Sequence, residues 1–60
     1  MHRAQVHKTN ALFIEKDMHL VAHGLVLSVM HLDHSSLVLV KRGYSTHIIE
    51  FEHDRWLLYK

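Results

Sequence analysis

The sequence predicts a mostly β fold, with one small domain over residues 11–60. The clearest evidence is residues 46–52, where polar and apolar side chains alternate with the period of two that a half-buried strand requires. Turn-forming residues stand on either side of this segment, Gly43 before it and Asp54 after it. A chain of 60 residues is long enough for one domain only.

The N-terminal segment, residues 1–10, is polar and is predicted to be a tail or a short helix outside the β domain. Residues 11–16 then alternate in the manner of a strand. A tight turn is predicted at residues 15–17, because the side chain of Asp17 can hydrogen-bond its own backbone. The first predicted strand therefore follows directly after the polar segment.

Residues 18–32 allow two interpretations. Alternation favours a long strand, whereas Leu20, His23 and Leu27 also fit the spacing of one helix face. Gly24 would destabilise a helix interior by about 1 kcal/mol but suits a bend or bulge in a strand. Both faces after this glycine are apolar, and valine is frequent. We therefore predict a strand bent at Gly24, with an α+β fold that has a helix over 18–32 as the alternative.

The C-terminal half is predicted to form two consecutive hairpins. A short apolar strand at 37–40 leads into a loop tip, KRGY, at 41–44. After the alternating segment, residues 53–54 make a second tight turn. The closing strand is Arg55–Lys60, which completes a set of five predicted strands.

Five strands with a long, bent second strand resemble in architecture the small SH3-like and Sm-like barrels, or a five-stranded antiparallel meander. The resemblance implies pairing through exposed edge strands. An Sm-like domain places an acidic residue closer to the glycine than Asp33 stands to Gly24. It also has an Asn in the following turn, where this chain has Ser35 and Ser36. Because the chain has no proline to protect its edges, they need closure, charge or a partner.

Composition favours a chain that associates with itself. A domain of this size seldom has more than about 3–5 kcal/mol of net stability from its core alone. The absence of cysteine excludes disulfides and thiolate–zinc sites as stabilisers. The apolar fraction of 48% and the charged fraction of 22% are those of a folded globular chain. We therefore predict a homo-oligomer, in its simplest form a homodimer.

Charge and hydropathy predict a cytoplasmic protein without a membrane partner. The net charge of +1 and the pI of about 8.2 lack the basic excess typical of nucleic-acid-binding domains. No apolar run follows the basic residues at the N-terminus, as a secretory signal would require. No apolar stretch is long enough to span a bilayer, and the lack of cysteine suits a reducing compartment.

The sequence contains none of the nucleophile, zinc-protease, P-loop or dinucleotide motifs that carry catalysis. His47, Glu50 and His53 come nearest to an acid–base group, but a strand places Glu50 on the face opposite the two histidines. A core of this size also encloses no ordinary substrate pocket. We predict a non-enzymatic protein that needs no cofactor.

Histidine is the most unusual feature of the composition, with eight in the chain. Imidazole nitrogen is a preferred ligand of zinc and nickel. The candidate ligands are His19, His23, His31 and His34. On a strand the first two would be about 13 Å apart, too far to share one ion unaided. Ordinary histidines are therefore the simpler interpretation, and a histidine–metal protein is the second alternative function. Sensing of pH by the same residues is a further alternative function.

Lys41, Arg42 and Tyr44 place two cations beside an aromatic ring at an exposed turn. Such a tip could bind phosphate while the tyrosine stacks on a base, and Arg55 could extend the surface. The competing interpretation is a charged tip that keeps the hairpin soluble, next to the acidic side chains of the following strand. A small barrel that binds RNA or DNA is therefore the first alternative function.

The closing strand carries large apolar side chains on both faces, because Trp56 and Leu58 alternate with Leu57 and Tyr59. One face covers the core, and the other needs the N-terminal segment or a second molecule. Large aromatic residues are common anchors of protein interfaces. The candidate partner-binding residues are Trp56, Leu57, Tyr59 and the tip residue Tyr44. We predict a small regulatory or inhibitory protein that acts by docking on another protein.

Overall fold

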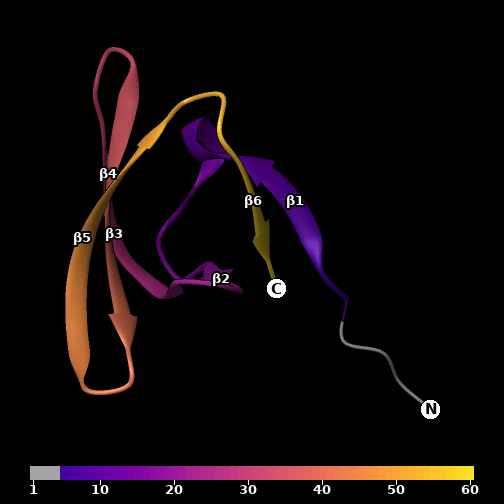
Figure 1. Ribbon diagram of the computed structural model, residues 1–60, viewed down its shortest axis with the longest axis vertical. Coiled ribbons are helices and arrows are strands. Elements are labelled where there is room, and N and C mark those ends of the chain that lie inside the picture. The colour runs from indigo at the N-terminus through magenta and orange to yellow at the C-terminus, as the bar shows by residue number, and fades with distance from the viewer. Residues whose placement is uncertain (1–4) are drawn as a thin grey trace.

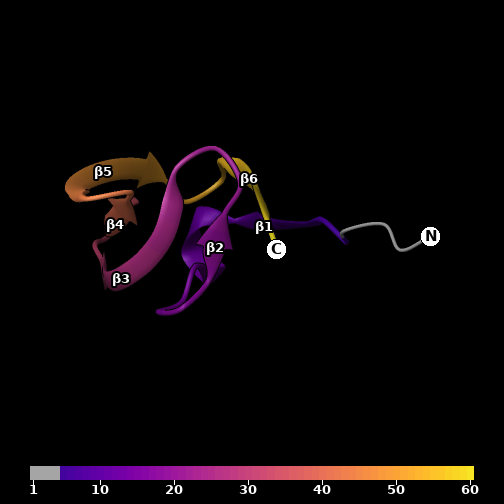
Figure 2. The same ribbon diagram turned by 90° about the horizontal axis from the view of Figure 1, so that it is seen from below.

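The computed structural model describes residues 5–60 and shows one sheet of six antiparallel strands (Figure 1). The elements are β1 (His7–Asn10), the 3₁₀ turn η1 (Ala11–Phe13), β2 (His19–Leu20), β3 (Gly24–His31), β4 (Ser35–Arg42), β5 (Ser45–Glu52) and β6 (Trp56–Tyr59). Their order across the sheet is β1-β6-β2-β3-β4-β5. The sheet curls, with β5, β4 and β3 on one side and β2, β6 and β1 on the other (Figure 2). The predicted mostly β fold is confirmed, as a half-barrel of six strands rather than five.

Strands β3, β4 and β5 form the long part of the sheet, and β4 pairs with both neighbours along its length. The β4–β5 turn consists of Gly43 and Tyr44, with Arg42 opposite Ser45. Gly43 has a φ of 64°, and Tyr44 does not have a positive φ. A positive φ at the first central residue is the pattern of a type II′ turn, whose twist matches that of the strands. The hairpin predicted near Gly43 is confirmed.

Residues 18–32 contain strands and no helix, so the α+β alternative is wrong. One long bent strand is also wrong, because β2 and β3 run antiparallel with Leu20 opposite Gly24. The N–H of His23 donates to the carbonyl of Leu20 at 3.2 Å and closes the turn between the two strands. Gly24 has a φ of 110°, and a Cβ there would collide with the backbone carbonyl of Lys41. Glycine is therefore needed to end a tight turn against β4.

The closing strand β6 does not pair with β5. It crosses to the other part of the sheet and lies between β1 and β2 (Figure 1). The turn predicted near Asp54 is present, with the N–H of Arg55 donating to the carbonyl of Glu52 at 3.0 Å. The second hairpin predicted there is wrong, because this turn leads the chain across the sheet instead of back along β5.

The N-terminal segment also differs from the prediction of a tail or short helix over residues 1–10. His7–Asn10 form β1, an edge strand on β6, and residues 1–4 lie outside the described part of the chain. Ala11–Phe13 form a 3₁₀ turn where a strand was expected. The N–H of Ala11 donates to the carbonyl of Arg55 at 3.0 Å, and Ala11 is fully buried. A contact with a distant part of the chain therefore shapes this segment.

The turn predicted at residues 15–17 is present. The N–H of Met18 donates to the carbonyl of Glu15 at 3.3 Å, and Asp17 has a φ of 74°, which Asp tolerates better than most residues. The chain then returns to the sheet, since the N–H of Val26 donates to the carbonyl of Met18 at 2.8 Å.

The hydrophobic core fills the inner side of the curled sheet. Its members are apolar side chains with at most 7% exposure: Ala11, Ile14, Leu20, Val26, Val38, Val40, Phe51 and Leu57. They come from the long strands as well as from β2, β6 and the segment around η1. The core therefore joins the two parts of the sheet to each other.

Candidate functional site

Strand β6 presents its largest side chain to solvent. Trp56 is 64% exposed and Leu58 is 46% exposed, whereas Leu57 between them is 7% exposed and belongs to the core. Tyr59 is half-buried, with its ring centroid 5.3 Å from that of His7 on β1. The structure thus places Leu57 and Tyr59 on the core side of β6, which corrects their assignment to a partner surface. Leu58 lies on the outward side with Trp56, because side chains alternate along the strand and Leu57 faces the core.

The outward side chains of β6 lie beside the turn between β2 and β3. The N–H of Val21 in this turn donates to the carbonyl of Leu58 at 3.0 Å, and the side chain of Val21 is 44% exposed. One shallow hollow is lined by Lys8, Trp56, Leu57 and Leu58. A second is lined by Val21, Ala22, His23, Arg55, Trp56, Leu57 and Leu58. The two hollows share β6 residues, so we treat Val21, Trp56 and Leu58 as one apolar surface, the β6 surface.

The predicted phosphate-binding residues divide between two places. Tyr44 is fully exposed at the tip of the β4–β5 hairpin, two residues after the end of β4. Arg42 and Arg55 both act on His23: burial lowers the pKa of this histidine, and the positive charges of Arg55 and then Arg42 lower it further. Arg55 lines one hollow with His23, and the backbone of Arg42 lies against Gly24, the residue after His23. The structure therefore brings two of the predicted cations near a histidine that the sequence suggested as a metal ligand or a pH sensor. Lys41 stands next to Arg42 and is exposed.

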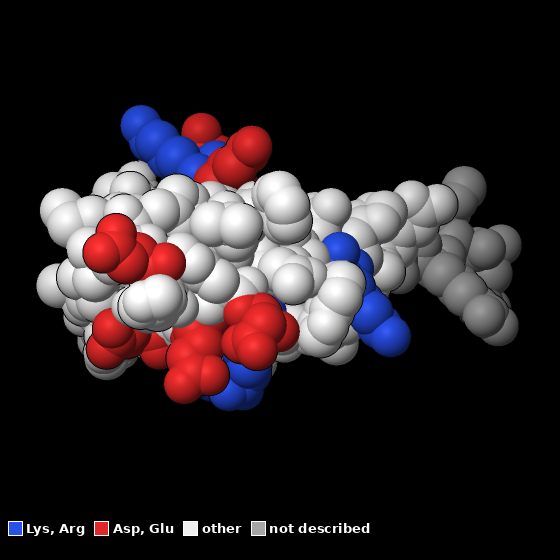
Figure 3. All heavy atoms as spheres, turned by 90° about the horizontal axis from the view of Figure 1, so that it is seen from above, with Lys and Arg blue, Asp and Glu red and all other residues white. Residues whose placement is uncertain are grey.

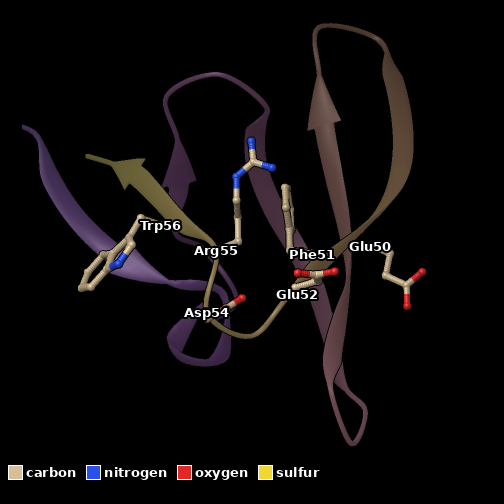
Figure 4. Close-up of a pocket in the computed structure, with 6 residues that line it drawn as sticks. All are labelled: Glu50, Phe51, Glu52, Asp54, Arg55 and Trp56. Atoms are coloured by element: carbon tan, nitrogen blue, oxygen red, sulfur yellow. The ribbon is translucent and has the colours of Figure 1, made fainter.

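Acidic side chains lie close to these cations. One hollow is lined by Glu50, Phe51, Glu52, Asp54, Arg55 and Trp56 (Figure 4). In this view Arg55 extends beside Phe51, and Trp56 points away from the carboxylates. On the face shown in Figure 3, acidic and basic atoms form several separate groups instead of one basic stripe. This face therefore lacks the continuous basic surface that is typical of nucleic-acid-binding domains.

The predicted metal ligands are divided between the two ends of β3. His19 and His23 stand before this strand, whereas His31 ends it and His34 lies in the turn that follows. Within residues 5–60, no three His, Asp or Glu side chains come together in an arrangement that could hold a metal ion. His31 instead places Nδ1 2.5 Å from Oγ of buried Ser36. The four-histidine group is not assembled, because an eight-residue strand separates its two pairs.

A second exposed apolar surface lies on the outer side of β3, β4 and β5. We call it the outer sheet face, and it consists of Met30, Leu37, Leu39 and Ile48. Met30 is 60% exposed and Ile48 is 71% exposed. None of these four residues is a candidate from the sequence. The signal that could have found it is the strand at 37–40, whose two faces are both apolar and both need cover.

No protein-family model matches this chain, and no similar curated protein or solved structure was found. Across residues 5–60, no helix has the length and apolar character needed to cross a membrane.

Proposed function

We propose that this chain is a small non-enzymatic regulatory or inhibitory protein that associates with itself. It docks on another protein through the β6 surface. The observation that carries the proposal is the exposure of Trp56, the only tryptophan of the chain, on a regular strand. The core position next to it is occupied by Leu57, so the tryptophan is not needed to fill the interior. The cysteine-free sequence supports the cytoplasm as the compartment.

The chemistry of the β6 surface fits a partner with an apolar pocket and an acidic rim. Tryptophan is among the most enriched anchors of protein interfaces. Removing the apolar area of Trp56 and Leu58 from water would stabilise a complex by several kcal/mol, at about 25 cal/mol per Å². Lys8 of β1 lies opposite Leu58 of β6. The aliphatic stem of Lys8 can cover apolar surface there while its ammonium group stays at the rim.

The described residues also support binding rather than catalysis. The nearest approach to a nucleophile–base pair is Ser36 with His31. Ser36 is fully buried, so a substrate cannot reach its hydroxyl group. We therefore assign this pair to the packing of β3 against β4, where the two residues lie opposite each other.

The test uses Trp56 as the probe. Polypeptides captured by the immobilised chain are purified, and each is titrated against the chain labelled with fluorotryptophan while fluorine NMR is recorded. Because the chain has one tryptophan, only Trp56 contributes a signal. We expect the resonance to shift on binding. Trp56→Ser should weaken binding by more than about tenfold, as is typical for a central aromatic anchor.

Phe13→Ser is the matched control, because Phe13 is an aromatic residue of similar exposure, 65%, and lines neither of the two hollows that Trp56 and Leu58 share. It should bind like the unaltered chain. A partner that binds Trp56→Ser as tightly as the unaltered chain would show that the β6 surface is not the docking site.

Binding of RNA or DNA is the second candidate, favoured by the positive charges of Arg42 and Arg55 near His23 and by the exposed Tyr44, two residues after Arg42 at the hairpin tip. Affinity for a short oligonucleotide would be measured over a salt series. Two phosphate contacts predict a slope of log K against log salt of about −2, and Arg42→Gln should reduce its size by about one. A slope of zero would exclude this function.

A further inference from the structure

The outer sheet face is a continuous apolar surface on the long part of the sheet. The strand register places Met30 of β3 opposite Leu37 of β4, and Leu39 of β4 opposite Ile48 of β5. Leu37 and Leu39 point away from the core, because they alternate along β4 with the core residues Val38 and Val40. Met30 and Ile48 lie opposite Leu37 and Leu39, so they share the same face. A shallow hollow lined by Ser28, Val29, Met30, Leu37, Leu39 and Ile48 runs across the three strands.

The two ends of this face carry opposite charges. Beyond Leu39 along β4 comes Lys41, exposed and paired with Thr46. At the other end Glu50 lies opposite Leu37, and Glu52 follows it on the same side of β5. Glu50 accepts a hydrogen bond of 2.6 Å from the Ser35 hydroxyl, which holds its carboxylate on the outer side. The face is thus apolar in the middle, basic at one end and acidic at the other.

We propose that a second copy of this chain covers the outer sheet face, in a two-fold symmetric sandwich of two β3–β4–β5 sheets. The two-fold axis lies between the sheets and perpendicular to their strands. This axis reverses the strand direction, so the apolar middles meet and each Lys41 lies over the acidic end of its partner. The symmetry forms the charge pair twice, as in any interface that uses the same surface of both subunits.

Self-complementarity is the reason to choose a second copy as the occupant. A sheet with the apolar middle alone could receive any apolar partner, but the opposed charges at its ends match an inverted copy of the same face. Two sheets packed in this way lie about 10 Å apart with their side chains interdigitated. The face spans about 26 Å along eight-residue strands and about 10 Å across three strands. It is smaller than the roughly 800 Å² per partner of a standard interface, so the dimer should be weak and reversible.

This inference rests on the self-association in the proposed function and names its surface. Sedimentation velocity from about 1 µM to about 500 µM would measure the dissociation constant of the dimer. Ile48→Asp should abolish dimers, and the fold should remain intact by circular dichroism, because Ile48 is 71% exposed. Trp56→Ser should leave the dissociation constant unchanged.

Charge reversal tests the orientation. Lys41→Glu and Glu50→Lys should each weaken the dimer by about tenfold, since two pairs are lost and like charges meet. The double variant should return to within about threefold of the unaltered chain. Lys16→Glu, the same change in an exposed turn away from this face, is the matched control and should have no comparable effect.

The outcomes separate this inference from the proposed function. A dimer that survives Ile48→Asp but is lost in Trp56→Ser would overturn the sandwich and leave self-association standing, with β6 as its surface. Failure of the double variant to recover, or an equal effect of Lys16→Glu, would overturn the proposed orientation. A monomer at every concentration would overturn both the sandwich and self-association, while docking through Trp56 is decided by its own titration.

Discussion

The two parts of the sheet are built in different ways. Strands β3, β4 and β5 have eight residues each and are joined by turns of two or three residues, so that neighbours in the sheet are neighbours in the sequence. Strands β1, β2 and β6 have four, two and four residues. Their pairing joins opposite ends of the chain, as shown by His7 opposite Tyr59.

The comparison shows which pairings a local sequence pattern can specify. A hairpin closes a short loop at little entropic cost, so alternation and a turn residue are sufficient to predict it. Strand β6 has equally clear alternation, but its partners lie far away in the sequence. Its position depends on a core formed by Leu20, Leu57 and residues of the long strands. Such non-local pairings must overcome a larger loop-closure cost before they gain any contact.

The largest effect is expected at Gly24, where the β2–β3 turn of the short part meets β4 of the long part. In Gly24→Ala the new Cβ would strain a φ of 110° and collide with the backbone carbonyl of Lys41. We expect a loss of more than about 3 kcal/mol in the free energy of unfolding, measured by urea denaturation.

Gly43→Ala is the matched control. Gly43 has a φ of 64°, and a Cβ there would meet no atom within 4 Å. The cost should be about 1–2 kcal/mol, from the backbone conformation alone. Equal losses in the two variants would mean that the two parts of the sheet do not meet closely at Gly24.

A smaller effect distinguishes the two faces of β6. Leu57→Ala should lower the free energy of unfolding by about 2–4 kcal/mol, because the side chain is 7% exposed and lies in the core. Leu58→Ala should cost less than about 1 kcal/mol, because Leu58 is 46% exposed. Thermal or urea unfolding of both variants would check this. The reverse order would place Trp56 and Leu58 in the core and remove the β6 surface.

The smallest effect concerns the pH dependence of stability. It tests how the β2–β3 turn, the end of β4 and the residue before β6 meet at His23. Its pKa is lowered from the usual 6.5 by burial, then by Arg55 and Arg42. Because the folded pKa is below the unfolded one, the unfolded chain binds the proton more tightly. The stability present above pH 6.5 is therefore lost as the pH falls from 6.5 through the folded pKa. His23→Gln should remove this component of the pH dependence.

Proton NMR titration gives the pKa of His23 directly. Arg55→Gln should raise it more than Arg42→Gln, because the charge of Arg55 has the larger effect. Lys16→Gln should leave it unchanged. If Arg42→Gln has no effect, the end of β4 is farther from the β2–β3 turn than the structure shows.

The candidate site could be predicted from the sequence only in part. Aromatic residues on the closing strand indicated an interface, and Trp56 and Tyr44 are indeed exposed. The strand faces the core with Leu57, however, and a period of two does not say which face turns inward. The approach of Arg42 and Arg55 to His23 had no sequence signal, since these residues come from three separate turns or strand ends.

The mostly β class, the hairpin at Gly43 and the turns at 15–17 and 53–54 follow from local sequence patterns. Each of these depends on residues within a few positions of one another, so local alternation and turn chemistry are sufficient. Long-range packing places β6 between β1 and β2, makes Ala11–Phe13 a turn instead of a strand, and selects the side chains that remain exposed. Those choices arise from burial of side chains against strands distant in the sequence. The free energy of that burial belongs to the folded core as a whole and not to any single segment.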